Sequence, residues 1–181
     1  ERFGRSVVTI TAHGVAGHAG NRPEYTANPF VELSDVVEYL ESRCDRERGI
    51  WYSPVSLHGG DKGPTAMTPE DAYVIYDIRY VDETLQKEAE ETLRSLKPKQ
   101  ANVHFEISGG MEKPPFRQTE ASSWLPARAK AIVEEMGHPF LPTRLGGGSD
   151  ANFTAAAGCP TLCGLGLNGD FLHNPKEYVV I

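Results

Sequence analysis

Residues 71–80, DAYVIYDIRY, constrain the fold more than any other stretch, because their side chains alternate in character. Side chains at every second position of a strand point to the same face. One face would carry Val74, Tyr76, Ile78 and Tyr80, and the other Tyr73, Ile75, Asp77 and Arg79. This alternation predicts a strand with two different faces.

The stretches around this strand complete a regular order. Further strands are predicted over 5–12, 49–59 and 101–110. Helices are predicted over 27–42 and 82–96. Asn28 can cap the first helix, Pro29 fits its first turn, and Asp82 starts the second. Pro54 indicates a sheet edge or a bulge. The order β-α-β-β-α-β is that of a ferredoxin-like α+β domain, with two helices on one side of a sheet, which we assign to residues 1–108.

Residues 109–181 have a different pattern, beginning with a predicted linker, GGMEKPPFRQT. A helix is predicted over 121–136, ended by Gly137. A glycine-rich loop then leads into a short helix, CPTLCGLG is predicted as a short buried strand, and another helix is expected to start after His173. These elements are too few to cover such a strand on both faces. We therefore expect 109–181 to be the truncated C-terminal portion of a larger α/β domain.

Composition excludes several kinds of partner and location. The net charge of −7 disfavours nucleic acid, which is bound mainly through Lys and Arg. No apolar run approaches the roughly 20 residues that span a bilayer, and no secretory signal is visible. The cysteines, Cys44, Cys159 and Cys163, are too few for a disulfide framework and suit the reducing cytoplasm. The apolar neighbours of CPTLC predict buried thiols.

The motif GGGSDANF has two readings. Gly146, Gly147 and Gly148 would let the backbone adopt positive φ and approach a ligand closely. Ser149 can cap the following helix, and free amides there suit a carboxylate. The alternative is a tight loop before a capped helix, without any ligand.

Two histidines are candidates for chemistry. His18, in GVAGHAGNRPE, lies on a loop of small residues, where it could donate a hydrogen bond to developing negative charge or simply be a surface histidine. His173 is a candidate metal ligand, but zinc requires three or four ligands. None of the other histidines shows a paired ligand spacing.

Taken in order, GHAGNRPE, YDIRY, GGGSDANF, GLG and HNPKEYV resemble the M20 family of metallopeptidases and amidohydrolases. Within it, the pattern is similar to the carboxypeptidase G2-like glutamate carboxypeptidases, with N-acyl amino acid deacylases and succinyl-diaminopimelate desuccinylases as relatives. The resemblance implies a homodimeric hydrolase with two zinc or similar divalent ions in an α/β catalytic domain. It also implies that residues 1–108 form a lid that mediates dimerisation, and that 109–181 return to the catalytic domain.

The resemblance also implies roles for single residues. His18 matches the lid histidine that reaches across the dimer and polarises the scissile carbonyl, and His173 matches the last metal ligand. The substrate-binding set is Gly146, Gly147, Gly148, Ser149 and Asn152, in the loop that touches the substrate carboxylate.

For three basic residues the resemblance implies less. Arg79 is expected to form a structural ion pair. Arg144 or Lys113 would approach a substrate carboxylate, although some relatives have arginine at the position of Lys113, whose single ammonium cannot form a bidentate fork.

One position departs from the family pattern. Ala66 stands where many members carry an asparagine that contacts substrate across the dimer. This difference weakens the expectation that the lid binds substrate.

The other metal ligands of the family have no counterparts in these residues. We therefore expect this chain to be a fragment, inactive alone, of a hydrolase that cleaves amide bonds of peptides or N-acyl amino acids. The alternative is a non-catalytic dimerisation module. An RNA-binding domain is disfavoured, because the sequence lacks the required aromatic run and its charge is negative.

Overall fold

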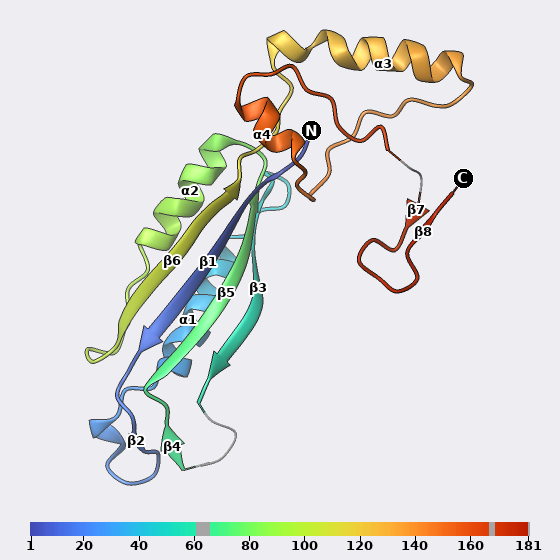
Figure 1. The fold of residues 1–181 in the computed structure, drawn as a ribbon. Coiled ribbons are helices and arrows are strands. Elements are labelled where there is room, and N and C mark those ends of the chain that lie inside the picture. Colours follow the sequence, from blue (N-terminus) through green and yellow to red (C-terminus); the bar gives the residue numbers. More distant parts are fainter. Residues whose placement is uncertain (61–65, 167–168, 181) are drawn as a thin grey trace.

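The computed structural model describes residues 1–60, 66–166 and 169–180. Its main body is a four-stranded sheet in the order β3-β5-β1-β6, with all neighbouring strands antiparallel. The strands are β1 (Gly4–His13), β3 (Ile50–Gly59), β5 (Asp71–Tyr80) and β6 (His104–Lys113). Two helices, α1 (Pro29–Ser42) and α2 (Glu83–Arg94), lie against one face of the sheet (Figure 1). The predicted ferredoxin-like α+β fold is confirmed.

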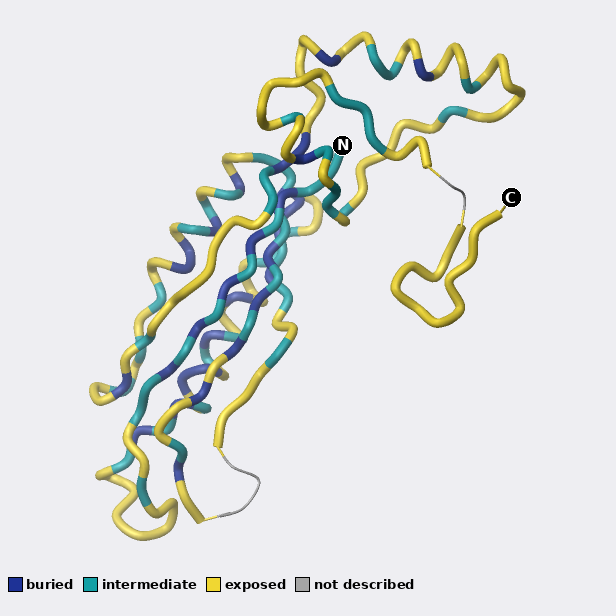
Figure 2. The backbone as a smooth tube through the Cα atoms, in the orientation of Figure 1, coloured by how far each residue is buried: buried dark blue, intermediate teal, exposed yellow. Residues whose placement is uncertain are grey.

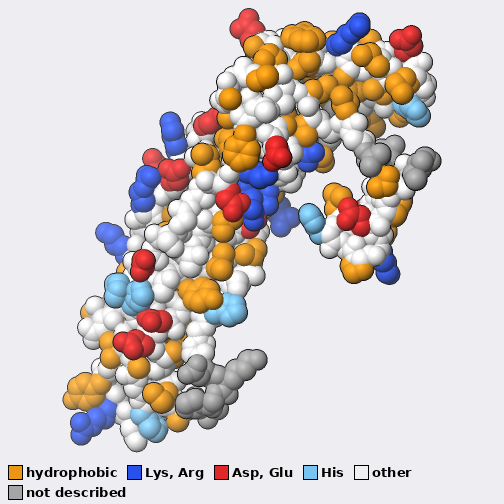
Figure 3. Space-filling model, in the orientation of Figure 1, with side chains coloured by type: hydrophobic (Ala, Val, Ile, Leu, Met, Phe, Trp, Pro, Cys, Tyr) orange, Lys and Arg blue, Asp and Glu red, His pale blue; other side chains and the backbone are white. Residues whose placement is uncertain are grey.

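The core lies between this sheet and the two helices. On β5 the predicted apolar face is buried, with Val74, Ile78 and Tyr80 all 0% exposed. The neighbouring strand β1 buries Val8, Ile10 and Ala12 in the same way, so the two central strands are the most buried part of the chain (Figure 2). The opposite face of the sheet carries no helix and is open to solvent over much of its length (Figure 3).

Local sequence signals fix where the two helices start. The Asn28 side chain accepts a hydrogen bond from the Phe30 N–H at 3.0 Å, and Pro29 occupies the first turn of α1. Asp82 Oδ1 accepts the Leu85 N–H at 2.9 Å at the start of α2. Both predicted caps are confirmed, and each satisfies a backbone donor that has no partner inside its helix.

The prediction for Pro54 is also confirmed. Strand β3 lies at the edge of the sheet, and its register against β5 shifts between Pro54 and Ser56. Proline has no N–H to give to a ladder, so a bulge on an edge strand is where it costs least.

Strand β6 runs further than predicted. Gly109 and Gly110, which end the predicted strand and begin the predicted linker, both lie within the strand with φ of 91° and 153°, and the strand continues to Lys113 past a register shift against Arg5 and Ser6. A Cβ on Gly109 would lie 2.3 Å from the Val7 carbonyl oxygen, so this position requires glycine. The predicted domain boundary at 108 falls inside β6. The boundary stays a prediction, and the end of the strand at Lys113 favours placing it there.

Short elements lie at the end of the sheet where β1 ends. Strand β2 (Gly17–His18) pairs with β4 (Met67–Thr68), and the 3-10 helix η1 (Pro23–Tyr25) follows β2. Part of the loop predicted over 60–70 lies outside the described residues.

Residues after β6 form few regular elements. They are the 3-10 helix η2 (Glu120–Ser122), α3 (Trp124–Glu135), α4 (Ala151–Ala156), β7 (Gly169–Asp170) and β8 (Tyr178–Val179). Gly137, with φ of 80°, follows the end of α3 as predicted.

Three predictions in this region are wrong. CPTLCGLG is not a strand, since no described strand runs beside it to take its hydrogen bonds. Its thiols are not buried as predicted either, because Cys159 is exposed and Cys163 is half-buried. Instead of a helix after His173, β7 and β8 form a hairpin. A helix of one or two turns is marginal, and Val179 and Val180 favour a strand. Ile181, the last residue of that predicted helix, lies outside the described residues.

No helix of the described residues is both long enough and apolar enough to cross a membrane.

The core contains a matched pair of tyrosines with different hydrogen bonding. Tyr80 Oη lies 3.1 Å from the buried Ser6 hydroxyl, whereas the buried Tyr76 hydroxyl has no partner among the described residues. We expect Tyr80→Phe to lower the free energy of unfolding by about 1 kcal/mol and Tyr76→Phe to leave it unchanged or raise it by about 1 kcal/mol. Urea denaturation measures both, and clear destabilisation by Tyr76→Phe would contradict the assignment.

Candidate functional site

The glycine loop, Gly146–Ser149, is joined to the end of the sheet where β1 begins. Backbone bonds hold the residue before it: the Phe3 N–H donates to the Leu145 carbonyl at 3.2 Å, and the Leu145 N–H donates to the Glu1 carbonyl at 3.2 Å. The chain start, α4 and the ends of β5 and β6 therefore lie side by side (Figure 1).

A charged cluster on the open face of the sheet underlies this loop. Arg5 and Arg79 are direct cross-strand partners on β1 and β5, a placement that would destabilise the sheet by repulsion. Asp77 lies between them and accepts from Arg79 Nε at 2.5 Å, from Arg79 Nη2 at 3.0 Å and from Arg5 Nε at 2.8 Å. The ion pair expected for Arg79 is confirmed. Burial alone would raise the pKa of Asp77, but these hydrogen bonds outweigh it, so the pKa lies below its ordinary value.

Two arginines of this end contact the carbonyl groups of the glycine loop. Arg79 Nη1 donates to the Gly146 carbonyl oxygen at 2.9 Å, and Arg2 Nη1 donates to the Gly147 carbonyl oxygen at 3.3 Å. No local pattern in the sequence indicated either contact, since the partners are 67 and 145 residues apart.

Asn152, predicted to bind substrate, is 0% exposed. Its Nδ2 donates to the Phe3 carbonyl at 3.1 Å and to the Pro114 carbonyl at 2.7 Å, and its Oδ1 accepts the Ser149 N–H at 2.9 Å. The side chain thus joins the chain start, the end of β6 and the glycine loop. Its amide is fully used within the chain, so any effect on substrate would pass through Ser149.

The conformation of the glycine loop differs from the prediction. Gly146, Gly147 and Gly148 do not adopt positive φ. Only Gly148 is crowded, because a Cβ there would lie 2.8 Å from Lys113 Cδ. Close approach therefore accounts for Gly148 alone, and positive φ accounts for none of the three glycines.

The basic residues expected near a substrate carboxylate are both engaged. Arg144 pairs with Glu1, with Nη2 and Oε2 2.6 Å apart. Lys113 Nζ lies 3.8 Å from Asp150 Oδ1 and next to the crowded Gly148. Lys113 is therefore the basic side chain that borders the loop itself.

Ser149 contacts a thiol that the sequence did not point to. Its Oγ lies 3.2 Å from Cys163 Sγ and 3.3 Å from the Ala151 N–H. Burial alone would raise the pKa of Cys163, but hydrogen bonds from Ser149 and Arg2 lower it below the ordinary value. Helix α4 begins at Ala151, two residues after the predicted cap.

His18 lies at the opposite end of the sheet, exposed in the short two-stranded pairing of β2 with β4. Its Nδ1 accepts the N–H groups of Gly20 and Asn21, both at 3.1 Å. An Nδ1 that accepts two hydrogen bonds places the ring proton on Nε2, which leaves an N–H donor at the tip of the side chain.

The two ends are too far apart to act on one substrate within one chain. Strand β1 runs from Gly4, beside the glycine loop, to His13, near the β2–β4 pairing. Ten residues of strand at about 3.3 Å each separate the two ends by about 30 Å. His18 and Gly146–Ser149 are therefore not brought together.

His173 is exposed in the turn between β7 and β8, with φ of 63°, a conformation in which histidine is one of the enriched residues. Among the described residues, no three His, Cys, Asp or Glu side chains are placed to share a metal ion. Two zinc ions therefore do not fit these residues on their own.

Two other histidines form a cluster on the open face. The rings of His13 and His104 stack with centroids 4.5 Å apart, and His13 Nδ1 lies 2.7 Å from Asp71 Oδ1. The hydrogen bond with Asp71, helped by Glu106, raises the pKa of His13 above its ordinary value. The cluster lies apart from the glycine loop.

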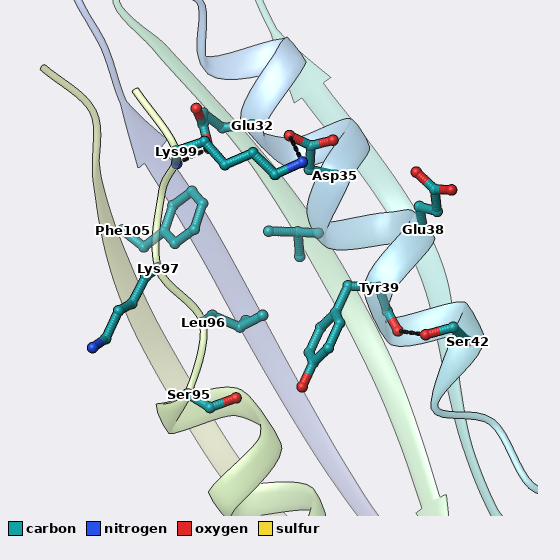
Figure 4. Close-up of a pocket in the computed structure, with 11 residues that line it drawn as sticks. Glu32, Asp35, Glu38, Tyr39, Ser42, Ser95, Leu96, Lys97, Lys99 and Phe105 are labelled. Atoms are coloured by element: carbon teal, nitrogen blue, oxygen red, sulfur yellow. Dashed lines mark hydrogen bonds and ion pairs between the residues drawn. The ribbon is translucent and has the colours of Figure 1, made fainter. Parts of the chain in front are cut away.

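A hollow of about 500 Å³ lies between α1 and the segment joining α2 to β6 (Figure 4). None of the predicted site residues lines it. The buried Glu32 carboxylate accepts the Lys99 and Gln100 N–H groups at 2.9 and 2.8 Å, and Lys99 Nζ pairs with Asp35 at 2.9 Å. These contacts hold α1 against the connecting segment, so the hollow is part of the packing interface between these two elements.

Comparisons with known proteins place these features in context. Residues 1–105 match the M20 model described as a peptidase dimerisation domain. The chain is 30% identical over 184 residues to carboxypeptidase G2 of Pseudomonas sp. (strain RS-16), covering 98% of this chain and 43% of that protein. It is 27% identical over 187 residues to the succinyl-diaminopimelate desuccinylase of Hydrogenovibrio crunogenus, covering 95% and 46%. The chain thus spans less than half the length of these relatives.

Solved structures share the fold at lower sequence identity. A tripeptidase from Staphylococcus aureus has a TM-score of 0.79 at 16% identity, covering 97% of this chain and 46% of its own. The aminopeptidase PepT from Bacillus cereus has a TM-score of 0.79 at 20% identity, covering 97% and 47%. The arrangement of residues 109–181 is therefore shared with these proteins as well as that of the sheet domain.

The low pKa of Asp77 predicts how stability depends on pH. A carboxyl group whose pKa is lowered on folding stabilises the fold above its unfolded pKa of about 3.9, and this contribution is lost as pH falls through the folded pKa. Asp77→Asn should lower the free energy of unfolding by about 2 kcal/mol at pH 7, with the difference from wild type shrinking below about pH 4. Urea denaturation across this range measures it.

The matched control is Asp35→Asn, which removes an exposed ion pair with Lys99 and should leave stability nearly unchanged. A loss for Asp77→Asn that is the same at pH 3 and pH 7 would contradict the pairing.

Proposed function

The chain belongs to the M20 peptidase family through its dimerisation domain, and from this premise we propose that it is part of a hydrolase that cleaves amide bonds of peptides or N-acyl amino acids. The similarity to carboxypeptidase G2 and the desuccinylases supports this, because it covers 95–98% of the chain, including residues 109–181. A free-standing dimerisation module, the alternative, would not require the residues after β6, which the similarity to these relatives also covers.

The single observation that carries the proposal is the separation of His18 from the glycine loop. A rigid sheet about 30 Å long keeps them apart within one chain. Both can serve one substrate only if a second copy supplies His18. We therefore propose a homodimer that forms through the lid, with each site built from both copies.

The proposed chemistry divides between these parts. His18 would donate its Nε2 hydrogen to the carbonyl oxygen of the scissile amide, where negative charge develops during attack. The backbone of Gly146, Gly147 and Gly148, with Ser149 and Lys113 at its border, would hold the substrate carboxylate. Asn152 would maintain the shape of this loop from beneath.

His173 would be one ligand of a divalent metal site, and zinc is the expected ion. The described residues do not assemble such a site, so the other ligands would come from residues outside this chain segment, and the 181 residues alone would be inactive. When bound, such ions polarise a carbonyl group and activate water. The contributions of His18 and the glycine loop stand without any step through the metal.

The remaining parts of the proposal concern the surroundings. Cys44, Cys159 and Cys163 are all free thiols, which suits the cytoplasm. The net charge of −7 argues against nucleic acid, and small peptides or N-acyl amino acids are the proposed substrates.

Subunit mixing tests whether the site is shared. The assay uses a polypeptide that contains these residues together with the remaining ligands, with N-acetyl-L-glutamate and zinc. We expect His18→Ala and His173→Ala each to lower kcat at least about 100-fold. Random reassembly of the two variants should restore about a quarter of the wild-type activity, because half of the dimers are mixed and each mixed dimer has one intact site.

Mixing each variant with itself is the control and should restore nothing. If the mixture of the two variants stays inactive while mixed dimers are shown to form, the shared site is refuted. Turnover by the isolated 181 residues would refute the external origin of the other ligands.

A further inference from the structure

The guanidinium group of Arg79 is divided between two tasks. Nε and Nη2 bind both oxygens of Asp77, and Nη1 binds the Gly146 carbonyl. Because guanidinium is planar, the bidentate contact with Asp77 fixes the plane and leaves Nη1 a single direction. The side chain is only 19% exposed. Asp77 thus aims Arg79 at the glycine loop.

The direction of a carbonyl group fixes the direction of the next N–H. In a trans peptide, the C=O of one residue and the N–H of the next point to opposite sides. With the Gly146 carbonyl bound to Arg79, the Gly147 N–H points away from the sheet. With the Gly147 carbonyl bound to Arg2, the Gly148 N–H points away from that arginine in turn.

These two N–H groups are available donors of the loop, as is the Gly146 N–H, which has no acceptor among the described residues either. The Ser149 N–H is already bonded to Asn152 Oδ1 at 2.9 Å. The N–H groups of Gly147 and Gly148 have no acceptor within the part of the chain that the structure describes. The direction of these N–H groups is therefore set by Arg79 and Arg2, which bond the carbonyl groups on the other side of the peptides. These two side chains do not touch the group that the N–H groups face.

We propose that Arg79, held by Asp77, is a positioning residue: it orients the peptide groups of the glycine loop so that the Gly147 and Gly148 N–H groups can receive a substrate carboxylate. This deepens the proposed function, and the part concerning the carboxylate rests on it. Three of the five N–H donors of Arg79, one on each nitrogen atom, bond within the chain.

The orienting role is tested in the 181-residue chain by amide hydrogen exchange, resolved by NMR. The reporters are the N–H groups of Leu145 and Ser149, which bond to Glu1 and Asn152 when the loop is in place. Arg79→Gln should speed their exchange at least about tenfold, since a hydrogen bond to a charged group is lost. The core amides of Ile10 and Val74 should stay protected.

Two further variants make the result specific. Arg79→Lys keeps the charge but cannot bind Asp77 in a fork and Gly146 at the same time, so it should also speed exchange; if lysine restores protection, only charge matters and the proposal is overturned. Arg48→Gln is the matched control, because Arg48 forms an equivalent fork with Glu88 on the helix side. It should leave both reporters unchanged. Unchanged exchange in both Arg79 variants would also overturn the proposal.

The carboxylate role is tested separately, by titrating N-acetyl-L-glutamate and following the Gly147 and Gly148 amide resonances. Wild type should show saturable shifts, and Arg79→Lys should bind at least about tenfold more weakly. If wild type does not bind the probe while the exchange effect holds, Arg79 still orients the loop but the proposed function loses its carboxylate site. If wild type and Arg79→Lys bind equally, the positioning role is overturned.

Discussion

The account depends on the length and stiffness of one antiparallel sheet. Four ten-residue strands hold the β2–β4 pairing, with His18, at one end and the glycine loop at the other. One face of the two central strands is buried against α1 and α2, so the sheet cannot fold back to bring its ends together. Whatever these residues do chemically, a single copy keeps them about 30 Å apart. The dimerisation domain therefore also keeps His18 and the glycine loop of one copy apart.

A second interaction joins the sheet to the segment that follows it. Asp77 binds Arg5 and Arg79 on the open face, and Arg79 then holds the Gly146 carbonyl. Strand β5, which carries Arg79, follows β4, which pairs with the His18-bearing strand β2 at the other end of the sheet. One strand thus supports both candidate regions, and a shift of the sheet relative to the glycine loop would have to break a partly buried contact to a charged group, which is costly.

The sequence predicted the sheet domain well because its determinants are local. Alternation in 71–80, the caps Asn28 and Asp82, and the bulge at Pro54 each depend on a few neighbouring residues. The predictions that were wrong concern places where distant contacts decide. The predicted linker began at Gly109, yet pairing with β1 continues strand β6 to Lys113. No described strand pairs with residues 159–166, so the apolar composition of this segment alone misled the strand prediction. The contact of Arg79 with Gly146 joins residues 67 apart, and no sequence pattern encodes it.

The mass of the chain in solution tests the central claim most directly. One chain has a mass of 19.9 kDa, and in the proposed homodimer each site is built from two copies. Light scattering after size exclusion, over a range of concentrations, should give twice that mass, about 40 kDa, at the upper end. A mass of one chain at every concentration reached would contradict the account, because the two ends of the sheet would then have no means of meeting.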